Sequence, residues 1–122
     1  MTLRERQSVF AVMLGKLLCF ADKQGTPVCI LELYRSLETQ KAYVARGVSK
    51  TLNSKHLEGL AVDLVFLEDL RDDGKMNYSP EKYLTLGQFW ESIGGRWGGR
   101  FGDNPATEKI EGWDSGHFQF ND

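Results

Sequence analysis

The sequence contains few of the residues that mark special chemistry: two cysteines, two histidines and three prolines among 122 residues. Cys19 and Cys29 lack the two-residue spacing of a redox or zinc-binding pair. We therefore expect two free thiols in the core, although the sequence leaves a single disulfide between them open.

An excess of charge of one sign and a long apolar run are also missing. With 15 basic and 17 acidic side chains, the formal net charge of −2 provides no basic surface for nucleic acid or anionic membranes. No stretch approaches the ~20 apolar residues of a membrane-spanning helix. Lys16, Asp22 and Lys23 interrupt the apolar residues near the N-terminus, so we expect no secretory signal and a chain made in the cytosol.

The composition is ordinary for a globular domain, with 41% hydrophobic and 26% charged residues. Domains typically contain about 100–150 residues. We expect residues 1–122 to form one domain, present as a monomer. Many of the 13 glycines lie in the last third of the chain, which predicts loops there.

Apolar periodicity predicts three helices and three strands. The helices are expected over residues 3–22, 36–46 and 80–93. The strands are expected over residues 28–34, 60–67 and 118–120. Between them the sequence predicts a loop or strand edge, a charged turn and an irregular segment, at residues 53–58, 68–75 and 96–112.

Turn and cap residues support these boundaries. Ser36 is suited to cap the second helix, and Gly47 to end it. Ser79 followed by Pro80 is a typical start for the third helix. Because the elements show no regular strand–helix alternation, they favour an α+β fold with a small, mostly antiparallel sheet and flanking helices.

Each histidine lies in a stretch that is typical of half a metal site. His56 is followed by Gly59, which permits a sharp turn, and by Asp63 on a predicted strand. His117 begins another strand, which could lie beside the first. Two imidazoles and a carboxylate are the ligands of a catalytic zinc with an open fourth position. Spacing alone leaves the alternative that both histidines are surface residues or satisfied core groups.

Asp114, three residues before His117, also has two interpretations. It suits a general base that takes a proton from water and returns it to a leaving amine. It equally suits a cap or a turn residue before Ser115 and Gly116.

Four segments, in order, resemble the D-Ala-D-Ala metallopeptidase family, which shares a zinc fold with the hedgehog signalling domain. The third segment resembles the Trp-Gly-Gly stretch of phage L-alanyl-D-glutamate endopeptidases. Together they extend over residues 28–120. The segments are Tyr34-Arg35-Ser36 followed by Gln40, Ser54-x-His56-x-x-Gly59-x-Ala61-x-Asp63, Trp97-Gly98-Gly99-Arg100-Phe101 and Trp113-Asp114-x-x-His117-Phe118-Gln119.

The resemblance implies a DD-peptidase-like zinc fold and a role for individual residues. His56, Asp63 and His117 would be the Zn²⁺ ligands, and Asp114 would be the catalytic base. Arg35 would stabilise the oxyanion near the scissile carbonyl. A salt bridge at the mouth of the sheet is the structural alternative for Arg35.

Three further residues are assigned to the substrate side of the cleft. Ser54 would position the substrate or the groups behind the ligands, and Gln40 would contact the substrate or support Arg35. Trp97 flanks the inferred cleft with Trp113, and packing in the core is its alternative role.

The function implied by the resemblance is hydrolysis of the peptide stems of bacterial peptidoglycan, with the L-Ala–D-Glu bond as first choice. A phage or prophage endolysin would accumulate in the host cytoplasm and reach the cell wall at lysis. A D-Ala-D-Ala carboxypeptidase or dipeptidase would use the same residues. A catalytically inactive, zinc-stabilised binding module is the alternative from another class.

Two polar segments need separate interpretation. Residues 102–112 are longer and more polar than the family minimum, and we expect them to line the cleft. The acidic stretch 69–74 does not have the spacing of a calcium-binding loop, so it is predicted to be a solvated turn.

Overall fold

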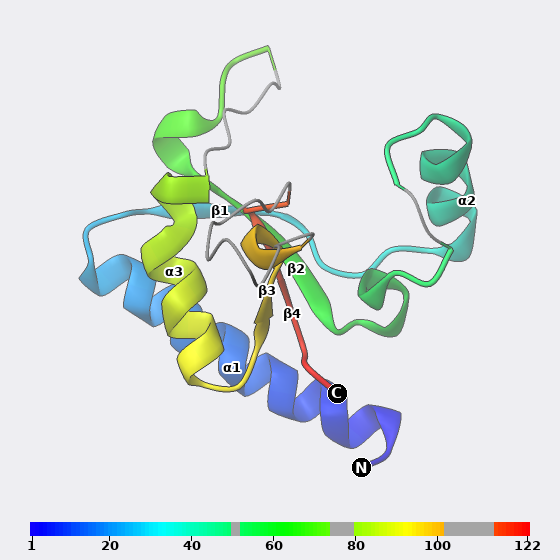
Figure 1. The fold of residues 1–122 in the computed structure, drawn as a ribbon, viewed down its shortest axis with the longest axis horizontal. Coiled ribbons are helices and arrows are strands. Elements are labelled where there is room, and N and C mark those ends of the chain that lie inside the picture. The colour runs from blue at the N-terminus through cyan, green and yellow to red at the C-terminus, as the bar shows by residue number, and fades with distance from the viewer. Residues whose placement is uncertain (50–51, 74–79, 102–113) are drawn as a thin grey trace, which may run out of the picture.

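Three helices and a four-stranded sheet make up the part of the chain that the computed structural model describes, residues 1–49, 52–73, 80–101 and 114–122 (Figure 1). The sheet has the order β1-β2-β4-β3, and each of its pairings is antiparallel. The predicted α+β class is therefore confirmed. The elements are α1 (Leu3–Lys23), β1 (Val28–Glu32), α2 (Leu37–Ala45), β2 (Ala61–Phe66), α3 (Pro80–Ser92), β3 (Arg96–Trp97) and β4 (His117–Gln119).

The helix ends follow the cap residues. The Thr2 side chain accepts a hydrogen bond from the Glu5 N–H, and the Glu5 carboxylate accepts one from the Thr2 N–H, so α1 begins with a capping box. Ser36 caps α2 by accepting from the Thr39 N–H. Gly47 follows with φ +73°, a conformation that glycine adopts without strain.

The helices α1 and α3 lie side by side against one face of the sheet, whereas α2 lies apart (Figure 1). Their inward stripes and the alternate residues of β2 form one hydrophobic cluster, because every second strand residue faces the helices. Trp90 is fully buried in this cluster, and its indole N–H donates to the Gln119 carbonyl at 2.9 Å. The opposite face of β2 carries Ala61, Asp63 and Val65.

Several local predictions are wrong. Within residues 96–112, Arg96–Trp97 forms β3, a strand too short to produce a recognisable pattern. Residues 53–58 were expected as a loop or strand edge, but Lys55–Glu58 forms a 3₁₀ helix, η1. Both thiols are free, as predicted, but Cys19 is exposed and Cys29 only half-buried.

The acidic turn is also less solvated than predicted, because Asp69 is buried and pairs with Lys82. The predicted cap Ser79, the loop 102–112 and Trp113 lie outside the described residues.

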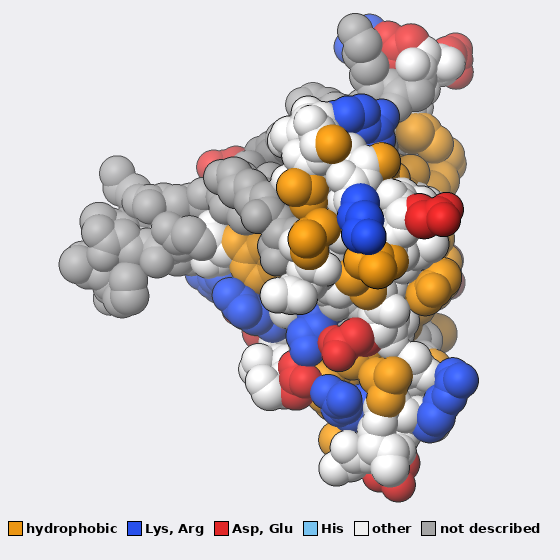
Figure 2. All heavy atoms as spheres, turned by 90° about the vertical axis from the view of Figure 1, so that its right-hand side faces the viewer, with side chains coloured by type: hydrophobic (Ala, Val, Ile, Leu, Met, Phe, Trp, Pro, Cys, Tyr) orange, Lys and Arg blue, Asp and Glu red, His pale blue; other side chains and the backbone are white. Residues whose placement is uncertain are grey.

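The face that carries α2 has a mixed surface. Figure 2 shows its hydrophobic side chains interspersed with basic and acidic ones. The most exposed large apolar side chains near β1 and α2 are Tyr34 at 68%, Val48 at 67% and Leu37 at 51%. Every described helix is too short or too polar to cross a bilayer.

Close packing between α3 and β3 can be tested at Gly87. A Cβ at Gly87 would lie 2.1 Å from Trp97 Cδ2, whereas one at Gly15 in α1 would meet no atom within 4 Å. We expect Gly87→Ala to lower the free energy of unfolding by about 1–3 kcal/mol through overpacking. Gly15→Ala is the matched control and should raise it by up to about 1 kcal/mol, because alanine favours helix. Urea denaturation followed by circular dichroism measures both, and similar changes in the two variants would contradict the packing.

Candidate metal centre

The short helix η1 (Lys55–Glu58) positions His56. The Ser54 hydroxyl accepts a hydrogen bond from the His56 N–H at 3.2 Å, and Gly59 ends the helix with φ +68°. The His56 ring is 2% exposed. Its Nδ1 donates to the Leu33 carbonyl at 2.7 Å. This hydrogen bond places the ring proton on Nδ1 and leaves Nε2 as the atom available to a metal.

Strand pairing positions the other two predicted ligands. Asp63 on β2 lies directly opposite His117 on β4, so both side chains point to the same face of the sheet. Asp63 Oδ1 is 3.0 Å from His117 Nδ1. The other ring nitrogen, Nε2, donates to Gln119 Oε1 at 2.8 Å. His117 therefore directs Nδ1 at the carboxylate.

The three groups converge closely enough to hold one ion. One ligand atom from each of His56, Asp63 and His117 lies within 4.8 Å of the other two. His56 Nε2 is buried and has no hydrogen-bond partner in the part of the chain that the structure describes, and it lies 3.1 Å from Asp63 Oδ2. Acceptor atoms facing one another in a buried site need a proton or a cation between them. The ligand set therefore fits a divalent metal such as zinc.

The pKa shifts of Asp63 and His117 also indicate that this site favours positive charge. Burial favours the neutral acid, but the hydrogen bond from His117 and the neighbouring His56 ring outweigh it and hold the pKa of the Asp63 carboxyl well below its usual range. Burial alone would lower the pKa of His117, but the hydrogen bond to Asp63 and the charge of Asp114 raise it. Both shifts thus have one cause, the attraction between the Asp63 carboxylate and positive charge on its neighbours.

Asp114 lies beside the ligands rather than among them. Its Oδ2 is 3.8 Å from His117 Nδ1, and its side chain is 40% exposed. Burial raises the pKa of this carboxyl, His117 opposes the rise, and the charge of Asp63 adds to it. A carboxylate that is partly solvated and holds its proton more firmly than usual suits a proton-transfer role.

Arg35 lies at the edge of the same cluster. Its main-chain N–H donates to the His56 carbonyl at 3.1 Å. Its Nη2 is 3.7 Å from Asp63 Oδ2, and its Nη1 is 3.5 Å from the Ser54 hydroxyl. Arg35 and half-buried Ser54 thus both lie next to the predicted ligands.

Gln40 and Trp97, assigned above to the substrate side of the cleft, are both buried in this structure, with 0% exposure. Gln40 accepts a hydrogen bond from Arg35 Nη1 at 2.7 Å, which is the supporting role considered as its alternative. The Trp97 indole N–H donates to the Ser115 carbonyl at 2.7 Å. A Cβ at Gly98 would lie 2.1 Å from the Asp114 carbonyl oxygen. This segment therefore packs against the turn that carries Asp114.

Sequence reasoning missed several supporting groups. His56 is oriented by the main-chain carbonyl of Leu33, and a main-chain group cannot be predicted from the pattern of residue types. Gln119 shares a face with His117 in the predicted strand, which is the signal that could have identified it. Glu32, three residues before Arg35, is the one charged residue in an otherwise apolar strand.

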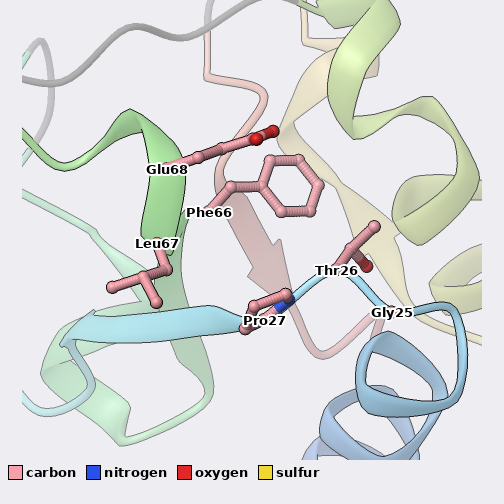
Figure 3. Close-up of a pocket in the computed structure, with 6 residues that line it drawn as sticks. All are labelled: Gly25, Thr26, Pro27, Phe66, Leu67 and Glu68. Carbon is pink, nitrogen blue, oxygen red and sulfur yellow. The ribbon is translucent and has the colours of Figure 1, made fainter.

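A separate hollow of about 240 Å³ contains none of the predicted site residues (Figure 3). It lies where β1 begins and β2 ends, at the other end of these strands from the metal ligands. Its lining residues are Gly25, Thr26, Pro27, Phe66, Leu67 and Glu68. The hollow therefore adds nothing to the candidate metal centre.

Comparisons with known proteins agree with the fold. Residues 47–120 match a family described as D-alanyl-D-alanine carboxypeptidase. The chain is 36% identical over 109 residues to an L-alanyl-D-glutamate peptidase of Listeria phage A118. That match covers 87% of this chain and 34% of the phage protein, so the chain spans about a third of that relative's length.

Two solved structures are similar. The L-Ala D-Glu endopeptidase ChiX of Serratia marcescens has 29% identity and a TM-score of 0.54, over 79% of this chain and 68% of ChiX. The vancomycin resistance D,D-pentapeptidase VanY, in complex with Zn(II), has 20% identity and a TM-score of 0.57. That match covers 92% of this chain and 70% of VanY, and at this identity it supports the fold alone.

Metal binding should compete with protons at His117. Its pKa is raised above the ordinary value of 6.5, so neutral His117 is scarce at low pH and the Zn²⁺ affinity should fall as pH decreases. Calorimetric titration of the metal-free protein with Zn²⁺ in two buffers of different ionisation enthalpy should detect about one released proton at pH 6 and fewer at pH 8. His117→Ala is the control for the site. Zn²⁺ binding by this variant with unchanged affinity would exclude His117 as a ligand.

Proposed function

Since the chain belongs to the D-alanyl-D-alanine carboxypeptidase family, we propose that it is a zinc peptidase that hydrolyses the peptide stems of bacterial peptidoglycan. One observation carries the proposal: two histidines and a carboxylate converge within 4.8 Å, with Asp114 and Arg35 beside them. A structural zinc site usually has four protein ligands and needs neither a base nor an adjacent guanidinium. These groups favour a peptidase over an inactive binding module.

His56, Asp63 and His117 would hold the ion. Zinc at a site of this type supplies a Lewis acid that polarises a carbonyl and acidifies water. The protein's own contribution is orientation, because hydrogen bonds to Leu33 and Gln119 direct one nitrogen of each imidazole at the ion.

Asp114 would move the protons of the reaction. Water adds to the carbonyl carbon of the scissile peptide, and Asp114 accepts the proton that the water loses. The carbon–nitrogen bond then breaks, and Asp114 returns the proton to the leaving amine. Its position 3.8 Å from His117 Nδ1 supports this role, as does its pKa, which burial raises.

Arg35 would stabilise the negative charge that develops on the carbonyl oxygen. A guanidinium keeps its charge at every relevant pH and presents several donors in a fixed plane. Nη2 lies 3.7 Å from Asp63 Oδ2, which supports a position next to the ion. Such preorganised charge acts without reorganisation during the reaction.

The L-Ala–D-Glu bond is the substrate bond that we favour. The phage A118 peptidase and ChiX are both L-Ala–D-Glu peptidases by description and share 36% and 29% identity with this chain. We propose an endolysin role, in which the enzyme accumulates in the host cytoplasm and reaches the wall at lysis. D-Ala-D-Ala carboxypeptidase activity is the second candidate, because the matching family carries that description.

Digestion of purified peptidoglycan, followed by mass spectrometry of the released fragments, tests the proposal. We expect free L-alanine carboxyl groups on the glycan-linked fragments and new N-terminal D-glutamate on the released stems. Loss of terminal D-alanine alone would establish the second candidate. A zinc-loaded protein that releases neither product would contradict the peptidase function.

Replacement of Asp114 separates catalysis from metal binding. Asp114→Asn should lower kcat by about 10²- to 10⁴-fold, the usual contribution of general acid–base catalysis. Zinc content, measured by atomic absorption, should stay at one equivalent per chain, because Asp114 is not a ligand. Asp22→Asn, at an exposed aspartate of α1, is the matched control with unchanged activity. Loss of stoichiometric zinc from Asp114→Asn would make Asp114 a ligand instead.

A further inference from the structure

A bulge in β1 determines the face on which Glu32 lies. The register shifts between Ile30 and Glu32, so Glu32 lies directly opposite Asp63 on β2. With regular pairing, Glu32 would lie opposite Val62, whose side chain belongs to the hydrophobic core. Because side chains alternate along a strand, the extra residue moves the Glu32 carboxylate from the core face to the face of the metal centre.

On that face, Glu32 is the main partner of Arg35. Its Oε1 accepts hydrogen bonds from both Nε and Nη2 of the guanidinium, the former at 2.6 Å. Gln40 Oε1 accepts from Nη1 at 2.7 Å. The Tyr43 ring covers one face of the guanidinium, with its centroid 4.7 Å from Cζ. Only 10% of the Arg35 side chain is exposed.

The Glu32 carboxylate is held from its other side as well. The Tyr43 hydroxyl donates to Glu32 Oε2 at 3.2 Å. One aromatic side chain thus contacts the face of the guanidinium and also binds the carboxylate that pairs with it. The three side chains of Glu32, Arg35 and Tyr43 fix one another, which restricts the guanidinium to a single plane.

The contacts with Glu32 also determine the distance between the Arg35 guanidinium and Asp63. Asp63 Oδ2 is 3.7 Å from Nη2, beyond hydrogen-bond distance, while Glu32 accepts from the same nitrogen. Two carboxylates therefore compete for one guanidinium, and Glu32 has the closer contact. Asp63 remains available to the histidines and to a cation.

We propose that Glu32 is a positioning residue, which acts through Arg35 to direct the guanidinium at the reacting carbonyl and to keep it off the ligand Asp63. The inference rests on the proposed peptidase function. It adds a residue to the reaction that works neither as a metal ligand nor as a proton carrier. Tyr43 shares the task to a smaller degree, because it binds only one oxygen of Glu32.

A double-mutant cycle tests whether Glu32 acts through Arg35. We expect Glu32→Gln to lower kcat about 10- to 100-fold, as is typical when a supporting partner of an active-site group is removed. KM and zinc content should stay unchanged. In an Arg35→Ala background, the same substitution should change kcat less than about twofold, because its target is absent. Glu38→Gln, at an exposed glutamate of α2, is the control with the same change in charge.

The proposal would be overturned if the effects of Glu32→Gln and Arg35→Ala on kcat were independent of each other. If Glu32→Gln lowers kcat equally with and without Arg35, Glu32 acts by itself. If Glu32→Gln does not fold, Tyr43→Phe replaces it in the cycle, with a smaller loss of kcat that must again vanish in the Arg35→Ala background.

Nuclear magnetic resonance provides a measurement that does not depend on hydrolysis. The Nε–H group of Arg35 donates to Glu32 in the wild-type protein, so its signal should be protected from exchange with water. Glu32→Gln should accelerate this exchange at least about tenfold, whereas Glu38→Gln should leave it unchanged. An unchanged exchange rate in Glu32→Gln overturns the positioning role. A wild-type protein that cleaves no peptidoglycan overturns the proposed function alone, because the exchange measurement still decides the role of Glu32.

Discussion

The carboxylate of Asp63 is the group on which the rest of the site depends. Its two oxygens face His117 Nδ1 at 3.0 Å and His56 Nε2 at 3.1 Å, and Arg35 Nη2 lies 3.7 Å away. Asp63 can occupy this position because β2 is a central strand, paired with β1 on one side and β4 on the other. A strand held on both sides gives its side chains little freedom, so the geometry around the carboxylate is rigid.

Electrostatics explains why this cluster favours a divalent cation. Glu32, Asp63 and Asp114 contribute three negative charges and Arg35 contributes one positive charge, which leaves a formal charge of −2 when the histidines are neutral. An uncompensated charge of this size is costly near a hydrophobic core. A divalent ion would cancel this charge.

Local sequence patterns were sufficient for much of the fold. The apolar periodicity of residues 3–22 and the Ser36 cap predicted two helices to within one residue at each end, because both signals act over one or two turns. The pair Arg96–Trp97 was missed, since a two-residue strand exists only through its pairing with β4. The burial of Trp97 could not be predicted from local spacing for a similar reason. The indole is enclosed by contacts with Gly87 and Ser115, which are distant from Trp97 in the sequence.

The sequence by itself determined which residue types are available: two histidines, a strand aspartate and a second aspartate three residues before His117. The tertiary structure alone decided that Asp63 lies opposite His117, because strand register depends on the packing of a whole sheet rather than on local spacing. It also decided the role of Glu32. By alternation this residue belongs to the core face, and the single extra residue in β1 moves it beside Arg35. A bulge exists only in the pairing of two strands, so no single segment of the chain encodes it.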